Sequence, residues 1–193
     1  MNLLRQSFPR RRLALCAAAS VVALVMTGCS KDVTKKDVND AGQTAEPTTL
    51  AVDQARTKAN HLSSQILDMI GIKDGKVTEG GAGVSLCDDD PDHLYRMRHP
   101  WSIYEVAPDK LEAGFQRLRE ILPKNGWKVV AYGRDTSANK NLELTADSEK
   151  DPFSVNASLR ITGASGNQQP MLQIRVVSGC FRAPKGTDLG KEY

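Results

Sequence analysis

The chain has 193 residues, of which 26 are basic and 23 acidic, and its formal net charge is +3. Four arginines and no acidic residue lie in residues 1–28, so loss of an N-terminal leader would leave 22 basic and 23 acidic residues. This balance, together with the lack of a basic patch or an aromatic-rich recognition motif, argues against DNA or RNA as a partner.

The first 28 residues have the pattern of an export signal. Arginines at positions 5 and 10–12 precede an uncharged apolar run of 14 residues, 13–26. A membrane-spanning helix needs about 20 apolar residues. The shorter run and the flanking positive charge favour a cleaved leader over a membrane span. We therefore expect residues 1–28 to be absent from the mature chain.

The apolar run ends at Met26-Thr27-Gly28-Cys29. This segment resembles the lipobox of bacterial lipoproteins, in which the cysteine is lipidated and becomes the first residue of the mature protein. The resemblance implies a lipid on Cys29 and a position on the outer face of the cytoplasmic membrane. Export would use the Sec pathway or, because residues 10–15 (RRRLAL) also resemble a twin-arginine signal, the Tat pathway.

Residues 29–49 are predicted to be a lipidated N-terminus and a flexible tether. The segment 30–49 is polar, lacks apolar periodicity and contains Gly42 and Pro47. A flexible chain of this length reaches roughly 25 Å, which would hold the following residues clear of the lipid headgroups. Residues 50–193 are then expected to form a single domain.

Two amphipathic helices are predicted in this domain. In the first, apolar residues recur at steps of three and four from residue 52, and Gly71 follows as a stop signal. The second starts at Pro108, which suits a first helical turn, and stops at Asn125-Gly126. The apolar stripes are Val52, Ala55, Ala59, Leu62, Ile66 and Met69 in the first helix, and Leu111, Phe115, Leu118 and Leu122 in the second.

Six segments have the composition and alternation of strands. Two lie between the helices, at 83–87 and 94–106, and Pro100 within the second indicates a sheet edge or a bulge. Four follow the second helix, at 127–132, 142–146, 153–161 and 171–180. The order α-β-β-α-β-β-β-β, with one polar face on each strand, predicts an α+β fold. We expect a two-layer sandwich of a mostly antiparallel sheet with two helices on one face.

The cysteines divide into three groups. Cys16 leaves with the leader and Cys29 carries the lipid, so Cys87 and Cys180 remain as an even pair in an exported protein, which favours a disulfide. Metal ligation is less well supported, because neither has a Cys or His at ligand spacing. The strand parity of Cys180 would aim it into the core, unless a bulge at Gly179 changes its direction.

The domain also resembles small secreted lipoproteins of high-GC Gram-positive bacteria. The similar parts are a helix ending in Asn125-Gly126-Trp127 and a meander ending in Ser178-Gly179-Cys180. The resemblance implies a fold and an extracytoplasmic location, and it implies no catalytic residue.

An acidic segment follows Cys87. Asp88, Asp90 and Asp92 alternate like the first ligands of a calcium loop, and oxygen ligands suit a hard cation. The EF-hand pattern also needs Gly at its sixth position and Glu at its twelfth, where this chain has His93 and His99. A solvated acidic turn, pairing with nearby arginines, is the preferred interpretation, and cation binding is the alternative. The sequence implies no resident metal or other cofactor.

Three aromatic residues lie on the strand that follows this turn: Tyr95, Trp101 and Tyr104. Aromatic side chains on a sheet edge can anchor a ligand or partner. Packing in the core is the preferred alternative, because the domain has few other large residues.

These features predict a lipid-anchored, extracytoplasmic binding or interaction module of the cell envelope. Its expected contacts are the membrane, through the lipid on Cys29, and an envelope protein or cell-wall component. The alternative is a small envelope hydrolase or cation-dependent enzyme with a site near residues 88–99. A non-enzymatic role is preferred because the sequence contains no catalytic constellation.

Overall fold

A computed structural model describes residues 46–161 and 169–191. The predicted leader, Cys29 and most of the predicted tether lie outside the described residues. The end of the tether already belongs to the domain, since the Leu50 amide donates to the Arg182 carbonyl at 3.0 Å and the Arg182 amide donates to the Thr48 carbonyl at 2.9 Å. In the described ranges, no helix is both long and apolar enough to cross a membrane.

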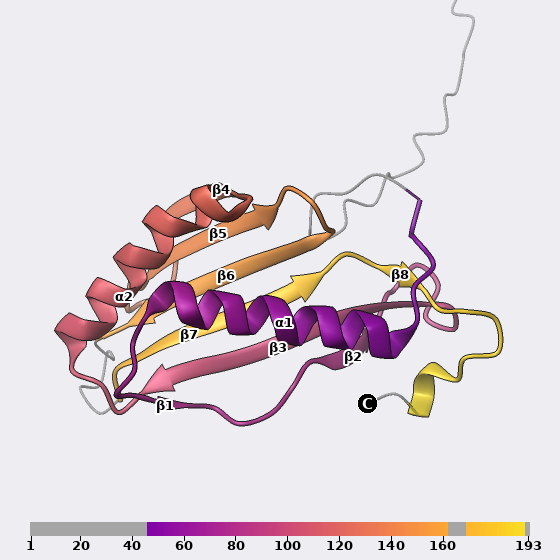
Figure 1. Cartoon of the computed structure of the whole chain (residues 1–193), viewed down its shortest axis with the longest axis horizontal. Coiled ribbons are helices and arrows are strands. Elements are labelled where there is room, and N and C mark those ends of the chain that lie inside the picture. Colours follow the sequence, from indigo (N-terminus) through magenta and orange to yellow (C-terminus); the bar gives the residue numbers. More distant parts are fainter. Residues whose placement is uncertain (1–45, 162–168, 192–193) are drawn as a thin grey trace, which may run out of the picture. The chain divides into compact units, whose positions relative to one another are not determined.

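Both predicted helices are present (Figure 1). Helix α1 spans Val52–Ile70 and ends at Gly71, which has a left-handed φ of 68° and an amide that donates to the Leu67 carbonyl. Helix α2 spans Pro108–Ile121 and continues as the 3₁₀ turn η1, Leu122–Asn125. Glycine suits the first of these stops because its lack of a Cβ removes the steric cost of a positive φ.

Within the described residues the sheet has eight strands, and the ladders between them are antiparallel. Six follow the order β1-β3-β7-β6-β5-β4, while β2 and β8 also pair with β3. The strands are β1 Lys76–Val77, β2 Gly83–Leu86, β3 Leu94–Tyr104, β4 Trp127–Arg134, β5 Leu142–Ser148, β6 Phe153–Arg160, β7 Met171–Ser178 and β8 Phe181–Arg182. The predicted α+β class and element order are confirmed, and the two-residue strands β1 and β8 are additions to the prediction.

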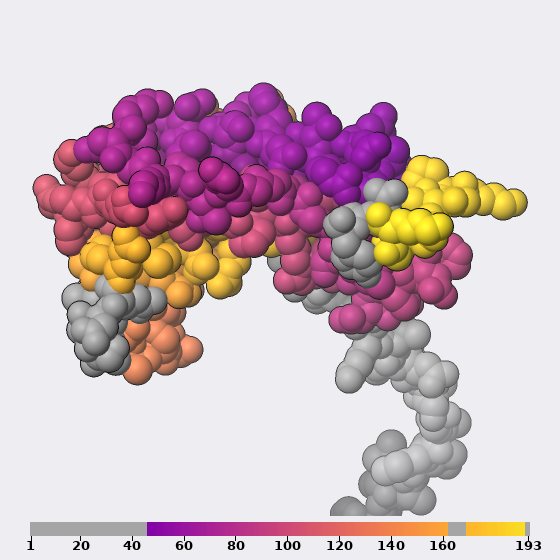
Figure 2. Space-filling view, turned by 90° about the horizontal axis from the view of Figure 1, so that it is seen from below, coloured from indigo at the N-terminus to yellow at the C-terminus, as the bar shows by residue number. Residues whose placement is uncertain are grey.

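Helices α1 and α2 cover one face of the sheet, as Figure 1 shows from the helix side. In the edge-on view of Figure 2, α1 lies in indigo above the strands. On the covered face, Trp101, Ile174, Ala157 and Leu144 lie opposite one another across four strands and are buried. On the uncovered face the polar Arg175, Asn156 and Thr145 form the neighbouring row. This division produces the expected two layers.

Pro100 occupies a local edge within the sheet. Strand β3 pairs with β2 through Tyr95–Arg98 and with β1 through Ile103–Tyr104, so Pro100 faces the interval between these two short strands. The Ser102 amide points to this side of β3, where it donates to the Thr78 hydroxyl at 3.2 Å. Because residues two apart in a strand direct their amides to the same side, an N–H at position 100 would point into the interval. The missing N–H of Pro100 therefore costs no ladder hydrogen bond.

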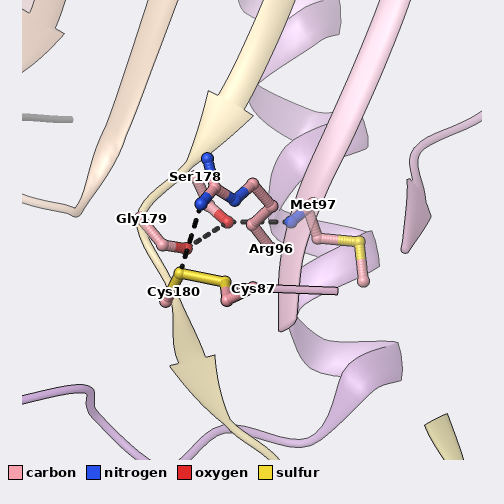
Figure 3. The surroundings of a disulfide bond; sticks show 6 residues. All are labelled: Cys87, Arg96, Met97, Ser178, Gly179 and Cys180. Atoms are coloured by element: carbon pink, nitrogen blue, oxygen red, sulfur yellow. Dashed lines mark hydrogen bonds between the residues drawn. A yellow bond between two sulfur atoms is a disulfide. The ribbon is translucent and has the colours of Figure 1, made fainter. Parts of the chain in front are cut away.

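The predicted disulfide between Cys87 and Cys180 is present (Figure 3). The two residues are 93 positions apart in the sequence and their Cα atoms are 6.4 Å apart. Cys87 follows β2, and Cys180 lies in the short break between β7 and β8. The bridge therefore ties the C-terminal end of the sheet to the start of the acidic segment.

The break at Gly179 decides which way Cys180 points. The Met97 amide donates to the Ser178 hydroxyl at 2.9 Å instead of to a backbone carbonyl, and that hydroxyl donates to the Gly179 carbonyl at 2.7 Å (Figure 3). Cys180 then packs with Cys87 and Leu94 in a small cluster separate from the main core. The sequence left open whether Cys180 points into the main core or is turned away from it by a bulge at Gly179. In the structure the break at Gly179 turns it away from the main core.

Candidate functional site

The acidic segment folds as a turn that is held by its own side chains. The Asp90 carboxylate accepts hydrogen bonds from His93 Nδ1 at 2.7 Å and from the Arg182 guanidinium at 3.4 Å. The bond from His93, followed by the charge of that residue and by Arg182, holds the pKa of Asp90 below its usual value. Asp88 and Asp92 are exposed. Asp90 thus has a structural role in joining the turn to β8.

The aspartates and histidines of this region do not converge. Within residues 46–161 and 169–191, no group of three or more His, Cys, Asp or Glu side chains is placed to hold a metal ion. His61 lies on the exposed side of α1, His93 on the acidic turn, and His99 beside Trp101 in a different pocket. The alternative of a cation-dependent enzyme with a site near residues 88–99 therefore has no preformed set of metal ligands among the described residues.

The three candidate aromatic residues lie on two faces of β3. Tyr95 is fully buried on the covered face, where its hydroxyl donates to the Leu50 carbonyl at 2.9 Å and its ring lies 5.9 Å from that of Phe181. Trp101 is also buried on that face. Tyr104 is half-buried and has the opposite strand parity. These aromatics consequently do not form one exposed patch.

Trp101 and His99 nevertheless share a small pocket with residues of α1. The pocket has a volume of about 120 Å³, is open to solvent on one side, and lies beside the interval between β1 and β2. We call it the α1/β3 pocket. It is lined by Ser63, Ser64 and Leu67 of α1, by Val77, Thr78 and Gly80 of β1 and the chain after it, and by His99 and Trp101 of β3.

Three buried polar atoms of this pocket's residues have no hydrogen-bond partner in the described structure: Ser63 Oγ, His99 Nδ1 and Trp101 Nε1. Ser63 and Trp101 are each only 4% exposed. A buried polar atom without a partner costs about 1–3 kcal/mol, and most such atoms in native proteins are paired. The three atoms are themselves fully buried, so they lie in the packing beside the pocket and not on its open surface.

Burial lowers the pKa of His99, and a hydrogen bond with the Gly80 backbone acts in the opposite direction. A backbone bond that raises a histidine pKa is one in which the ring N–H donates to a carbonyl, because a carbonyl stabilises the charged ring. The net lowering keeps the His99 imidazole uncharged at neutral pH.

The shift at His99 predicts a pH dependence of stability. Because its pKa lies below 6.5 only in the folded chain, the unfolded chain binds more protons as the pH falls through 6.5. We expect the free energy of unfolding to fall from about pH 7 toward the lowered pKa, and His99→Gln to reduce this fall. No other titratable side chain lines the pocket.

Urea unfolding of the wild type and His99→Gln, at about pH 7 and about pH 5.5, measures the effect. His61→Gln, which changes an exposed histidine, is the control. Equal pH dependence of the wild type and His99→Gln would contradict the expected shift.

A larger hollow, of about 440 Å³, lies between α2 and the hairpin that joins β4 to β5. Glu112 and Gln116 of α2 and Arg134 of β4 contribute to its wall. Another lining residue, Ile161, immediately precedes residues 162–168, which the structure does not describe. The α1/β3 pocket is taken as the candidate site, because it contains Trp101, one of the aromatic residues that the sequence singled out.

Sequence reasoning named Trp101 as a binding candidate and included His99 only as the end of the alternative site at residues 88–99. It did not single out Ser63, because a serine beside an apolar helical stripe has no distinguishing signal. Comparison with known protein families finds no family model that matches the chain, and comparison with curated proteins finds no match either. The function must therefore be inferred from the chemistry of the chain itself.

Proposed function

We propose that this protein is a lipid-anchored, extracytoplasmic binding module of the cell envelope. The observation that carries the proposal is the disulfide between Cys87 and Cys180. Disulfides persist in oxidising compartments outside the cytoplasm and are rare inside it. An exported location agrees with the arginine-flanked apolar leader, and the cysteine at position 29 supplies the point of attachment to the membrane.

Binding is favoured over catalysis by the state of the α1/β3 pocket. A catalytic serine needs a base within hydrogen-bond reach, and that base is usually oriented by a third group. Ser63 and His99 line the same pocket, but neither Ser63 Oγ nor His99 Nδ1 has a partner among the described residues. The hydrogen-bonded pair that a nucleophilic serine requires is therefore not formed by the described residues of this pocket.

The anchor predicts the effect of a single substitution. Cys29→Ala is expected to remove the lipid attachment point, so the protein would be released from the membrane or retained as an uncleaved precursor. A diacylated cysteine supplies the two acyl chains that stable anchoring requires. Membrane fractionation and intact-mass analysis of the wild type and the variant measure this outcome.

Cys16→Ala is the matched control, because it changes a cysteine inside the apolar run and leaves Cys29 in place. This control should remain lipidated and membrane-bound. If Cys29→Ala were still processed and membrane-bound, the anchoring part of the proposal would be wrong.

A further inference from the structure

The hollow between α2 and the hairpin that joins β4 to β5 has the size of a small-molecule site. We call it the α2/hairpin pocket. Its volume of about 440 Å³ lies within the range of about 300–1,000 Å³ that is usual for ligand pockets. A whole small ligand, and not only one functional group, therefore fits inside it.

The apolar part of the lining comes from the sheet. Leu142 of β5 and Leu159 of β6 lie opposite each other, on the face that the helices cover. Leu159 is 7% exposed, and Leu142 and Ile161 are half-buried. Aliphatic side chains of this kind provide contact area for an apolar group of a ligand.

Charged side chains of opposite sign line the two sides of the pocket. Glu112 lies on the α2 side, together with Gln116, which is four residues further along and so on the same side of the helix. Arg134 and Lys140 lie on the hairpin side. Among the described residues, no ion pair joins Glu112 to either cation. Opposite charges that share a pocket without touching leave room for a ligand that bears both charges.

The hairpin that carries the two cations is held by its own hydrogen bonds. The Asp135 carboxylate accepts from the Ser137 hydroxyl at 2.7 Å and from the Asn141 side-chain amide at 2.9 Å. The Arg134 guanidinium donates to the Lys140 carbonyl at 2.8 Å, and Lys140 has a left-handed φ of 49°. A non-glycine residue stays in this conformation only where its surroundings hold it there. The cations are therefore positioned before a ligand arrives, which lowers the entropic cost of binding.

The charges on the lining decide what kind of ligand fits. Arg134, Lys140 and Glu112 are the charged residues of the described lining. Asp135 lines a separate hollow along β4 and β5. A ligand with a positive charge alone would meet two like charges, and a ligand with a negative charge alone would leave Glu112 without a partner. A zwitterion is complementary to both sides of the pocket.

We infer that the α2/hairpin pocket binds a small zwitterion with an apolar side chain. Its carboxylate pairs with Arg134 and Lys140, its ammonium group pairs with Glu112, and its side chain contacts the leucines and the isoleucine of the lining. Free α-amino acids and short peptides with unmodified ends have this chemistry. The inference rests on the proposed binding function and supplies a ligand class for it.

Isothermal titration calorimetry of the full chain with L-leucine and with L-leucyl-L-alanine tests the two sources of the zwitterion. We expect saturable binding of at least one of them, and the one that binds more tightly identifies the source. That compound is then compared with its C-terminal amide, which has no carboxylate, and with its N-acetyl derivative, which has no ammonium group. Each derivative should bind more weakly by about 2- to 10-fold, because one charge pair is lost.

Two substitutions connect each ligand charge to its partner. Lys140→Gln should weaken binding of the zwitterion by about 2- to 10-fold but leave binding of the C-terminal amide unchanged. Glu112→Gln should likewise weaken binding of the zwitterion but leave binding of the N-acetyl derivative unchanged. Lys128→Gln in β4 and Glu120→Gln in α2 are the matched controls, because both residues are exposed and neither lines the pocket. These controls should bind like the wild type.

Three outcomes would overturn the inference. The first is that neither zwitterion binds saturably. The second is that either derivative binds as tightly as its parent compound, which would remove the role of one charge. The third is that the control variants weaken binding as much as Lys140→Gln and Glu112→Gln, which would place the ligand outside the pocket. The fractionation of Cys29→Ala measures membrane attachment separately, so failure of the anchor and failure of this inference are distinguishable.

Discussion

Removal of the disulfide, through the double substitution Cys87→Ala and Cys180→Ala, is expected to lower the free energy of unfolding by about 4 kcal/mol. The bridge joins residues 93 positions apart. A cross-link that closes so long a loop reduces the conformational entropy of the unfolded chain substantially. For a domain of this size, the loss corresponds to a fall in the melting temperature of about 10 to 15 °C.

Thermal and urea unfolding, each with and without a reductant, separate this effect from local packing. The wild type should become much less stable when reduced, whereas the double variant should not respond to the reductant. The two sulfurs are buried beside Leu94, and Cys180 Sγ accepts a hydrogen bond from Arg96 at 3.6 Å. Because the alanine substitutions also remove these contacts, the reduced wild type is the reference for loss of the bridge alone. An oxidised wild type no more stable than its reduced form would contradict the prediction.

Gly114→Val is expected to destabilise the domain by about 1 to 3 kcal/mol, the typical range for overpacking a well-filled core. Gly114 is buried within α2, where the helix meets the end of α1. A Cβ at this position would lie 2.8 Å from Cδ1 of Ile72 and 3.1 Å from Cγ2 of Ile70. Valine would add two further methyl groups and force the two helices apart.

Ala113→Val is the matched control for this prediction, because Ala113 is the exposed neighbour in the same helix. Helix propensity alone would make Gly114→Val slightly stabilising and Ala113→Val slightly destabilising, each by less than about 1 kcal/mol. Steric overlap reverses that order. Urea unfolding curves that rank the two variants according to helix propensity would show that the helices are loosely packed at Gly114.

The helices and the layer arrangement were predictable because they depend on local patterns. The spacing of Ala55, Ala59, Leu62 and Ile66 aligns four side chains along one side of α1, and all four are buried. In β6 the strict alternation of Val155, Ala157 and Leu159 with polar residues similarly determines which face meets the helices.

The candidate site was less predictable, because its properties depend on contacts between distant segments. Ser63, His99 and Trp101 come from one helix and one strand, and their polar atoms lack partners only because of how α1 packs over β3. No periodicity marks a serine that will be buried without a hydrogen bond. The open interval beside Pro100 depends on where β1 ends and β2 begins, and the two-residue β1 is too short to have a sequence pattern.

The sequence by itself determined the α+β class, the order of the elements and the pairing of Cys87 with Cys180, since side-chain periodicity and the number of available cysteines are properties of the chain alone. Its prediction of a lipid on Cys29 concerns residues that the structure does not describe. Only the tertiary structure decided that a break at Gly179 turns Cys180 away from the main core, and that polar atoms of Ser63, His99 and Trp101 are buried without a partner among the described residues. The physical reason is that strand register and the burial of individual atoms depend on packing between segments far apart in the chain.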